Sequence, residues 1–224
     1  MTEPSAEPPP SDEATDGPEV LVLVAHPQLE QSRVNRALMR AAGEVAAASK
    51  GRVEVVDLYA LYPDYLIDVK AEQARLKNVR LLVWQHPVQW YAMPPLMKLW
   101  LDEVLVFGWA YGPGGHALLG MDLWLALTTG GADESYRPEG YNRYFFDAFL
   151  PPVEQTAALC GMRFLPPLLL HGAHRVGPAA VAEHARVYAE RLASYPAWPE
   201  LDDLPECPTC VVPASARPPM EVSR

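Results

Sequence analysis

The stretch E-V-L-V-L-V-A at residues 19–25, followed by H-P-Q-L-E-Q-S at residues 26–32, determines the fold that we expect. A continuous run of leucine and β-branched residues is typical of a strand that is buried on both faces of a parallel sheet. After the loop, Ser32 is suited to cap a helix whose apolar face holds Val34, Leu38 and Val45. This strand, loop and helix form the first part of a βαβ unit.

Strand and helix signals alternate through the rest of the chain. Further strands are expected at residues 52–57, 80–85, 123–129 and 162–170, the last of them interrupted by two prolines. Further helices are expected at residues 68–78, 94–106, 144–160 and 177–195. Five strands that alternate with five helices predict an α/β protein with a doubly wound parallel sheet and helices on both faces. In such a sheet ligands bind beyond the carboxyl ends of the strands, beside the point where the strand order reverses.

The two ends of the chain differ in composition from its middle. The formal net charge is −10, of which residues 1–19 contribute −6 and residues 200–224 contribute −3, so the residues between them carry −1. We expect residues 1–18 to be a disordered, acidic, Pro-rich tail, residues 19–195 to form one domain and residues 196–224 to form a second Pro-rich tail. The near-neutral middle has no surplus of basic side chains, which argues against a nucleic-acid partner.

Cysteine content and hydropathy indicate the compartment. Three cysteines do not make a disulfide framework, and no apolar run reaches the ~20 residues that cross a bilayer. We therefore expect a cytoplasmic protein. Cys207 and Cys210 have the spacing of a redox pair or of half a zinc site, or they are an ordinary part of the tail, and no complete set of metal ligands is recognised.

The loop after the first strand brings polar groups to the N-terminus of a helix. Free N–H groups and the helix dipole make such an end an anion site. Ser32, Asn35 and His26 can add side-chain donors to a phosphate. Alternatively, Ser32 only caps the helix and His26 only packs the turn, and this loop alone leaves both interpretations open.

Two further loops at the expected switch point suit a flat ligand. The loop W-Q-H-P-V-Q-W-Y-A-M-P-P at residues 84–95 carries three aromatic rings, which can lie against a heterocycle or form a core cluster. The core alternative suits Trp84, which ends a strand, better than Trp90 and Tyr91. The loop T-T-G-G at residues 128–131 lets the backbone approach a ligand closely, or is an ordinary turn. A flat heterocycle joined to a phosphate indicates a mononucleotide, and flavin is the natural candidate.

Several motifs together resemble one family. They are A-H-P at 25–27, S-x-x-N at 32–35, L-Y-x-L-Y-P-D at 58–64, W-Q-H-P-x-Q-W-Y-x-x-P-P at 84–95, K-L-W-L-D at 98–102, G-W-A-Y-G-x-G-G at 108–115 and T-T-G-G at 128–131. Over residues 20–195 the chain resembles the flavodoxin-like NAD(P)H:quinone oxidoreductases, which include DT-diaphorase. Within that family it is most similar to the ancillary oxidoreductases of glutathione-regulated potassium-efflux systems.

The resemblance implies a fold, a cofactor and a reaction. The fold is a flavodoxin-like three-layer sandwich whose five-stranded parallel sheet has the order 2-1-3-4-5. The reaction is ping-pong two-electron reduction of quinones, with NADH or NADPH as donor, in a homodimer. The cofactor is FMN, with FAD the less favoured alternative because residues 28–31 form a compact loop. The implied flavin contacts are His26, Ser32, Arg33, Val34, Asn35, Val88, Gln89, Trp90, Tyr91, Thr128, Thr129, Gly130 and Gly131.

One departure from the family concerns proton transfer. Relatives such as DT-diaphorase use a Tyr five residues after the glycines and a His six residues further on. Tyr136 occupies the first position, and Asn142 occupies the second. Tyr136 is therefore our candidate catalytic residue, either as a proton donor to the quinone or only as part of the pocket wall. His171 and His174 flank the end of the fifth strand, in a quinone pocket or in a surface loop.

Two other functions compete with the enzyme. The resemblance also implies a regulatory subunit that docks on the cytoplasmic face of a potassium/proton antiporter and activates it, which would make the protein peripheral at the inner membrane. An electron-carrier flavodoxin is disfavoured because such carriers are strongly acidic around the flavin, whereas residues 20–199 are near neutral. The apolar helix at 94–106 is expected to be buried, against a second subunit or within the monomer.

Overall fold

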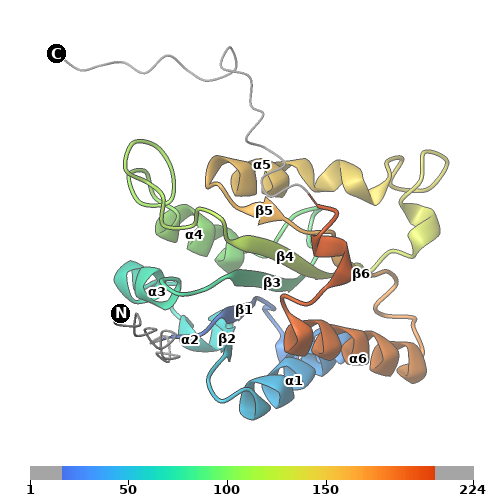
Figure 1. Ribbon diagram of the computed structural model, residues 1–224. Helices are drawn as coiled ribbons and strands as arrows, with labels where there is room; N and C mark the ends of the chain where they lie inside the picture. Colours follow the sequence, from blue (N-terminus) through green and yellow to red (C-terminus); the bar gives the residue numbers. More distant parts are fainter. Residues whose placement is uncertain (1–16, 205–224) are drawn as a thin grey trace, which may run out of the picture.

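The computed structural model describes residues 17–204, and at its centre is a parallel β-sheet (Figure 1). The strands are β1 (Val20–Val24), β2 (Val53–Asp57), β3 (Leu81–Pro87), β4 (Asp122–Thr128), β5 (Arg163–Phe164) and β6 (Leu168–Leu170). The order is β2-β1-β3-β4-β5, and β6 also pairs with β4. The expected order is thus confirmed. Successive strands are added toward one edge of the sheet from β1 to β2 and toward the other edge from β3 onward, so the switch point lies between β1 and β3.

The expected fifth strand consists of two short pieces. Pro166 and Pro167 lie between β5 and β6. Because proline has no N–H to donate to the sheet, it interrupts the ladder here. β5 pairs with the first residues of β4, and β6 pairs with its last three. β6 therefore brings the chain to the carboxyl edge of β4.

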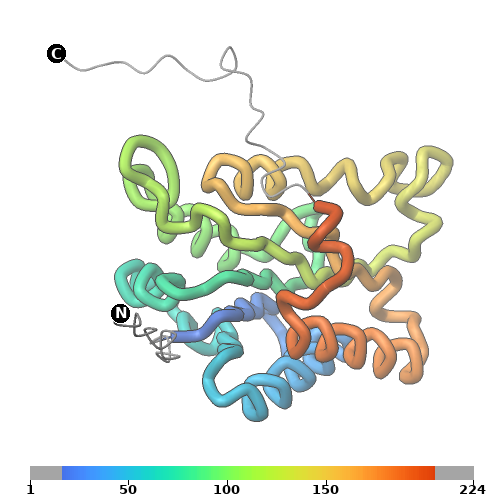
Figure 2. The backbone as a smooth tube through the Cα atoms, viewed as in Figure 1, coloured from blue at the N-terminus to red at the C-terminus, as the bar shows by residue number. Residues whose placement is uncertain are grey.

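Helices cover both faces of the sheet (Figure 2). One layer consists of α1 (Arg33–Ala48) and α6 (Pro178–Ser194), and the other of α2 (Leu58–Leu61), α3 (Val69–Arg75), α4 (Pro95–Val104) and α5 (Pro151–Leu159). Alternate residues of β1 supply the two cores: Val20, Val22 and Val24 face α1 and α6, and Leu21 and Leu23 face the other layer. Successive side chains of a strand point to opposite faces, so a run apolar at every position is needed between two helical layers.

Two expected boundaries differ from the structure. The helix expected from residue 144 begins only at Pro151, because Pro151 and Pro152 have no N–H to donate to an earlier turn, whereas proline suits the first helical turn. A short 3-10 helix, Phe146–Phe149, precedes it. The packed domain also continues past residue 195, since Trp198 and Leu201 are buried against the α1/α6 side of the sheet. Residues 1–16 and 205–224, with Cys207 and Cys210, lie outside the described residues.

Burial of α4 is accounted for within one subunit. Leu96, Met97, Trp100 and Val104 are buried in the core. The carboxylate of Glu72 is also buried there; it accepts hydrogen bonds at 2.8 Å from both Tyr62 Oη and Trp100 Nε1, and a third, at 3.3 Å, from the Arg75 guanidinium. A buried carboxylate needs such partners because transfer of an unpaired charge from water is costly. Between the two alternatives for this helix, its apolar side chains thus pack within the monomer.

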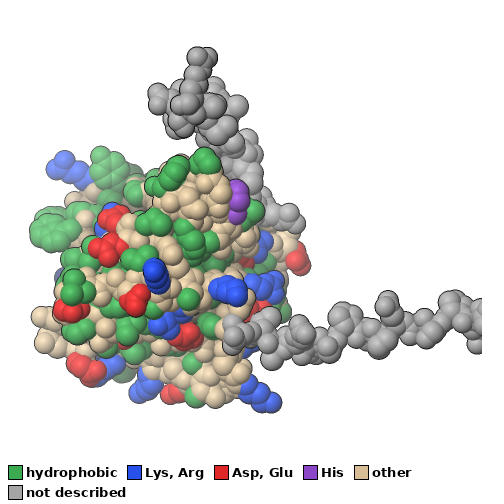
Figure 3. Space-filling view, turned by 90° about the vertical axis from the view of Figure 1, so that its left-hand side faces the viewer, with side chains coloured by type: hydrophobic (Ala, Val, Ile, Leu, Met, Phe, Trp, Pro, Cys, Tyr) green, Lys and Arg blue, Asp and Glu red, His purple; other side chains and the backbone are tan. Residues whose placement is uncertain are grey.

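Charged side chains at the amino ends of the strands are paired. Glu19, before β1, forms ion pairs with Arg52 and Arg80. Asp122, the first residue of β4, forms a two-pronged pair with Arg163 at 2.7 and 2.8 Å. On the left-hand side of the molecule in Figure 1, acidic and basic side chains alternate with hydrophobic ones, without an extended area of one sign (Figure 3). The described residues visible in this view therefore form no extended basic patch of the kind that binds a polyanion.

Candidate functional site

The loops after β1, β3 and β4 meet at the carboxyl edge of the sheet and enclose a cavity of about 450 Å³. Ten of the predicted cofactor residues line it: His26, Ser32, Arg33, Val34, Asn35, Val88, Gln89, Thr128, Thr129 and Gly130. The fifteen lining residues include an arginine and two histidines but no aspartate or glutamate. The cavity therefore favours an anionic group electrostatically.

The N-terminus of α1 forms one end of this cavity. Ser32 is the N-cap, and its Oγ accepts a hydrogen bond from the backbone N–H of Asn35 at 3.1 Å. The hydroxyl proton of Ser32 is then left to donate to a ligand. The N–H groups of the first helical turn have no acceptor within the helix, so they add to the anion-binding capacity.

Asn35 joins the first loop to β4. Its Nδ2 donates to Thr128 Oγ1 at 2.9 Å, and its backbone carbonyl accepts from Gln85 Nε2 at 2.9 Å. Asn35 is 2% exposed, and its Oδ1 has no hydrogen-bond partner among the described residues. A buried acceptor without a partner is unfavourable, so a ligand hydroxyl at this position would be stabilised.

His26 presents a donor nitrogen to the same cavity. Its Nδ1 accepts a hydrogen bond from the backbone N–H of Gln28 at 3.0 Å, which leaves the proton of the neutral ring on Nε2. Burial lowers the pKa of His26 from the ordinary value, while Asp57 acts in the opposite direction. Ser32 thus caps the helix and His26 braces the turn, and each side chain retains a donor hydrogen that could reach a ligand.

The segment after β3 makes a tight turn with strained geometry. Gln89 and Ala92 exchange two backbone hydrogen bonds, at 2.9 and 3.0 Å. Between them Trp90 and Tyr91 have φ angles of 49° and 64°. Bulky residues rarely adopt this left-handed geometry, and each such residue costs roughly 1–3 kcal/mol. The turn exposes 94% of Trp90, whereas Trp84 is fully buried in the core, as the sequence led us to expect for each.

A second cavity of about 340 Å³ adjoins the first, sharing Val88 and Gly130. The remaining predicted residues, Trp90, Tyr91, Gly131 and Tyr136, line it together with Ser135, Tyr141 and Asn142. The two cavities thus place a polar, anion-binding end beside an aromatic one, with the T-T-G-G backbone between them.

Tyr136 lies within an aromatic cluster at the wall of the second cavity. Its ring contacts Phe146 and Phe149 edge-on, with centroids 5.4 and 6.0 Å apart. Burial raises the pKa of Tyr136, so its hydroxyl is protonated at neutral pH. Tyr91 stacks on Phe149 with centroids 5.0 Å apart, which fixes the strained turn against the same cluster.

Sequence reasoning left two site residues in doubt. His174 lines the first cavity, and a β-carbon added at Gly130 would lie 3.4 Å from its ring. Nδ1 of His171 lies within hydrogen-bond distance of Thr129 Oγ1, at 2.9 Å. Both histidines follow β6, which pairs with the last residues of β4 and so brings them to this edge.

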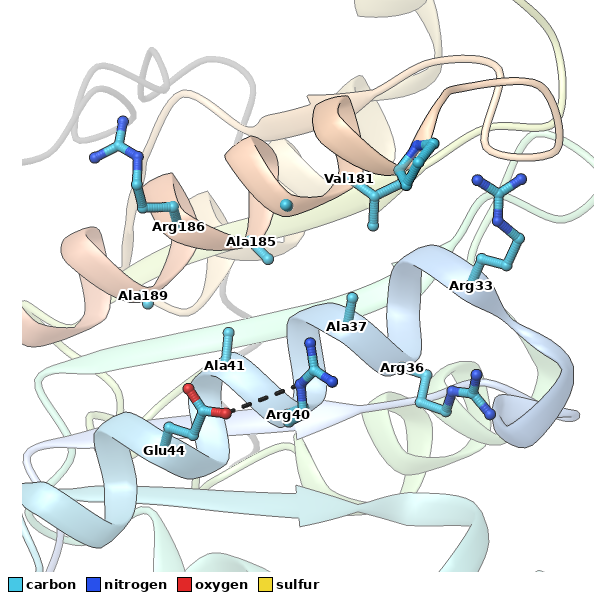
Figure 4. A pocket seen from close by; sticks show the side chains of 12 residues that line it. Arg33, Arg36, Ala37, Arg40, Ala41, Glu44, Val181, Ala185, Arg186 and Ala189 are labelled. Atoms are coloured by element: carbon cyan, nitrogen blue, oxygen red, sulfur yellow. Dashed lines mark ion pairs between the residues drawn. The ribbon is translucent and has the colours of Figure 1, made fainter.

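A larger cavity, about 550 Å³, lies in the groove between α1 and α6 (Figure 4). Alanines and a valine form its floor, and arginines stand at its rim. These arginines are engaged within the chain: Arg40 pairs with Glu44 at 3.9 Å, and Arg186 pairs with Glu183 at 2.6 Å. Arg33, which also lines the first cavity, donates to the carbonyl of Val176 at 2.7 Å. Without convergent free polar groups, this groove is a weaker ligand site than the carboxyl edge.

A sheet of this order, with a phosphate-suited helix end and an aromatic loop at its switch point, defines a class of protein. Residues 18–194 match the family with the flavodoxin-like fold, and the chain belongs to that family. Among its relatives is the glutathione-regulated potassium-efflux system ancillary protein KefF of Citrobacter koseri, which is 43% identical over 181 residues, covering 81% of this chain and 97% of that protein.

Two solved structures extend the comparison. General stress protein 14 of Treponema denticola, in complex with FMN, is 39% identical with a TM-score of 0.71, covering 78% of this chain and 98% of that one. A putative quinone reductase of Klebsiella pneumoniae is 28% identical with a TM-score of 0.67, covering 77% and 83% of the two chains. Within residues 17–204, the structure has no helix of the length and apolarity that a membrane crossing requires.

Proposed function

We propose that the protein is an FMN-dependent NAD(P)H:quinone oxidoreductase. The observation that carries the proposal is the paired cavity at the carboxyl edge, in which an acid-free polar end adjoins an aromatic end. The 39% identical relative with bound FMN and the 28% identical putative quinone reductase support the same function.

The residues present fit FMN. The α1 N-terminus, with Ser32, Arg33 and His26, would hold the phosphate through N–H and O–H donors. The unpartnered Oδ1 of Asn35 suits a ribityl hydroxyl. The isoalloxazine ring would lie against the 88–91 and 128–131 segments, with the remaining predicted contacts Val34, Val88, Gln89, Trp90, Tyr91, Thr128, Thr129, Gly130 and Gly131 around it. When bound, the flavin would accept a hydride from NADH or NADPH and pass two electrons to a quinone.

The chain itself would then bind, shield and protonate the substrate. The aromatic wall of the second cavity suits a flat quinone. The Tyr136 hydroxyl, kept protonated by burial, would donate to the quinone oxygen that becomes negative. Gly130 and Gly131 carry no side chains, so their backbone N–H groups could approach the ligand closely.

Cofactor content and turnover test this function. The purified protein should be yellow, its flavin absorbance should be bleached by NADH or NADPH, and a quinone should restore it. Mass spectrometry of the released cofactor distinguishes FMN from FAD. Tyr136→Phe should lower the rate of quinone reduction while leaving the FMN content unchanged. A colourless protein that takes up no added FMN would refute the proposal.

The exposed aromatic residues favour a homodimer. Trp90, Tyr141, Tyr144 and Phe145 are 94%, 88%, 61% and 60% exposed, and the first two line the second cavity. Exposed apolar groups of this size around a site mark an interaction surface. Light scattering should give twice the chain mass, and Trp90→Ser with Tyr141→Ser should shift the equilibrium toward monomers. A monomeric wild-type protein at micromolar concentration would contradict the dimer.

A regulatory role is the second candidate. The KefF relative, matched over 97% of its length, is an ancillary protein of a potassium-efflux system. A transporter partner predicts that this protein increases glutathione-regulated potassium efflux when it is supplied with the antiporter. Tyr136→Phe separates the two functions, because it should slow quinone reduction and leave activation of efflux intact. Efflux that is the same with and without the protein would exclude this role.

A further inference from the structure

An imidazole that the loop sequence does not reveal packs against Tyr136, which forms part of the wall of the second cavity. Asn142, six residues after Tyr136, accepts a hydrogen bond at its Oδ1 from the Tyr91 hydroxyl at 3.2 Å. His171, which follows β6, instead packs its ring against Tyr136, with centroids 5.0 Å apart and planes inclined by 34°. An imidazole therefore stands beside Tyr136, although it comes from a different segment of the chain.

Both nitrogens of the His171 ring face polar groups. Nδ1 lies 2.9 Å from Thr129 Oγ1, and Nε2 lies 3.6 Å from a carboxylate oxygen of Asp133. The Thr129 hydroxyl also donates to the carbonyl of Gly131 at 2.7 Å. A hydroxyl has a single proton, so in this arrangement the hydrogen between His171 and Thr129 belongs to Nδ1.

The groups around His171 act on its pKa in opposite directions. The titratable groups that face it are Asp133, Glu134 and Tyr136. Burial lowers the pKa of His171, and Asp133 and then Glu134 oppose that effect. Its side chain is 17% exposed, which is enough for contact with solvent. Thr129 lowers the pKa of Tyr136 against the effect of burial, and its Oγ1 lies 2.9 Å from Nδ1 of His171, so Thr129 acts on both rings.

We propose that His171 is a positioning residue, which orients the Tyr136 hydroxyl through Thr129 and replaces the proton that Tyr136 gives to the substrate. The inference rests on the proposed quinone reductase function. A quinone that receives a hydride, with NAD(P)H as the ultimate reductant, still needs one proton on its second oxygen. Tyr136 supplies that proton, the Thr129 hydroxyl turns from the Gly131 carbonyl and returns one to Tyr136, and the imidazolium form of His171 returns one to Thr129 from Nδ1, which leaves a neutral ring with its hydrogen on Nε2. Solvent then reprotonates His171, so protons and electrons balance.

Two substitutions of His171 separate orientation from proton supply. His171→Phe keeps a ring against Tyr136 but removes the bond to Thr129, and His171→Asn keeps a donor near the Nδ1 position but cannot titrate. In stopped-flow oxidation of the reduced protein by a quinone, His171→Phe should be slower by roughly tenfold to a hundredfold. His171→Asn should recover most of that rate near neutral pH.

The pH profile supplies the decisive difference. The wild-type rate should rise as the pH falls below 6.5 toward the lowered pKa of His171, and this rise should be absent in His171→Asn. His116→Asn, at an exposed histidine away from both cavities, is the matched control and should behave as wild type. A wild-type rate in His171→Phe, or an unchanged acidic rise in His171→Asn, would overturn the inference.

A second readout does not depend on turnover. An NMR titration of the His171 ring, with and without FMN, should give a lower pKa in Asp133→Asn and an unchanged pKa in the control Asp102→Asn. Equal values in Asp133→Asn and wild type would count against the inference. If the protein neither binds FMN nor reduces quinones, the proposed function fails. If it does both and His171→Phe is as fast as wild type, only the role of His171 fails.

Discussion

The stability of the apoprotein should depend on pH through His86, the histidine of the W-Q-H-P segment. His86 is 4% exposed. Its Nδ1–H donates a hydrogen bond to the carbonyl of Pro87 at 3.0 Å, and its Nε2 has no hydrogen-bond partner among the described residues. A second proton would place an unpaired N–H and a charge in the core, so burial lowers the pKa of His86 from 6.5 to about 4. The unfolded chain binds this proton more readily than the folded one between those two values.

The sign and size follow from that difference. Stability is fully present above pH 6.5 and is lost as the pH falls toward 4, because protonation favours the unfolded state. One pKa unit corresponds to about 1.4 kcal/mol, so the loss attributable to His86 between about pH 7.5 and about pH 4.5 is roughly 2.5 kcal/mol.

Urea denaturation of flavin-free protein across this pH range measures the effect. His86→Asn retains a donor toward Pro87 but does not titrate, so other acid-sensitive groups contribute equally to both proteins. The free energy of unfolding of wild type should fall by about 2.5 kcal/mol more than that of the variant. Parallel profiles of the two proteins would refute the reasoning, whatever their difference at neutral pH.

Three other substitutions test the site and the core. Ser32→Ala should weaken FMN binding by about tenfold to a hundredfold, since a hydrogen bond to a charged group is lost, while the exposed Ser194→Ala should bind FMN as wild type does in a fluorescence titration. Glu72→Ala should lower the free energy of unfolding by about 3–5 kcal/mol, as it leaves buried donors unpaired, and a loss below ~1 kcal/mol would contradict that view. Tyr195→Phe should cost about 1–3 kcal/mol in urea denaturation because it removes the hydroxyl that donates to Asp122 at 2.9 Å, and unchanged stability would show that this bond contributes nothing.

The sheet was predictable because its strands are apolar at nearly every position. Leu21 and Val22 face different cores, so the apolar pattern of residues 19–25 suits only a central strand that is covered by helices on both faces. The expected strand order was enough to predict that the loops after β1, β3 and β4 lie together, although no contact between them could be inferred from the sequence. Helix boundaries were less accessible, since residues 144–150 carry helix-compatible side chains but precede Pro151, and the chain forms a 3-10 helix there.

The parts of the site that escaped prediction depend on long-range contacts. Nothing local indicates that Asn142 bonds the Tyr91 hydroxyl or that His171 lies against Tyr136. The left-handed backbone at Trp90 and Tyr91 was equally hidden, because these residue types do not favour it. Packing of Tyr91 on Phe149 holds that geometry, and Phe149 is distant in the sequence.

The pairing of Asp122 with Arg163 at the first residues of β4 and β5 has a practical consequence for engineering. Thr128 ends the same strand, and a strand of this length separates the two positions by roughly 20 Å. Substitutions made that far apart, without shared partners, change stability additively. A library confined to the amino edge of the sheet can therefore be selected for heat tolerance alone, and a second library at the loops for new electron acceptors, before the two are combined in one chain.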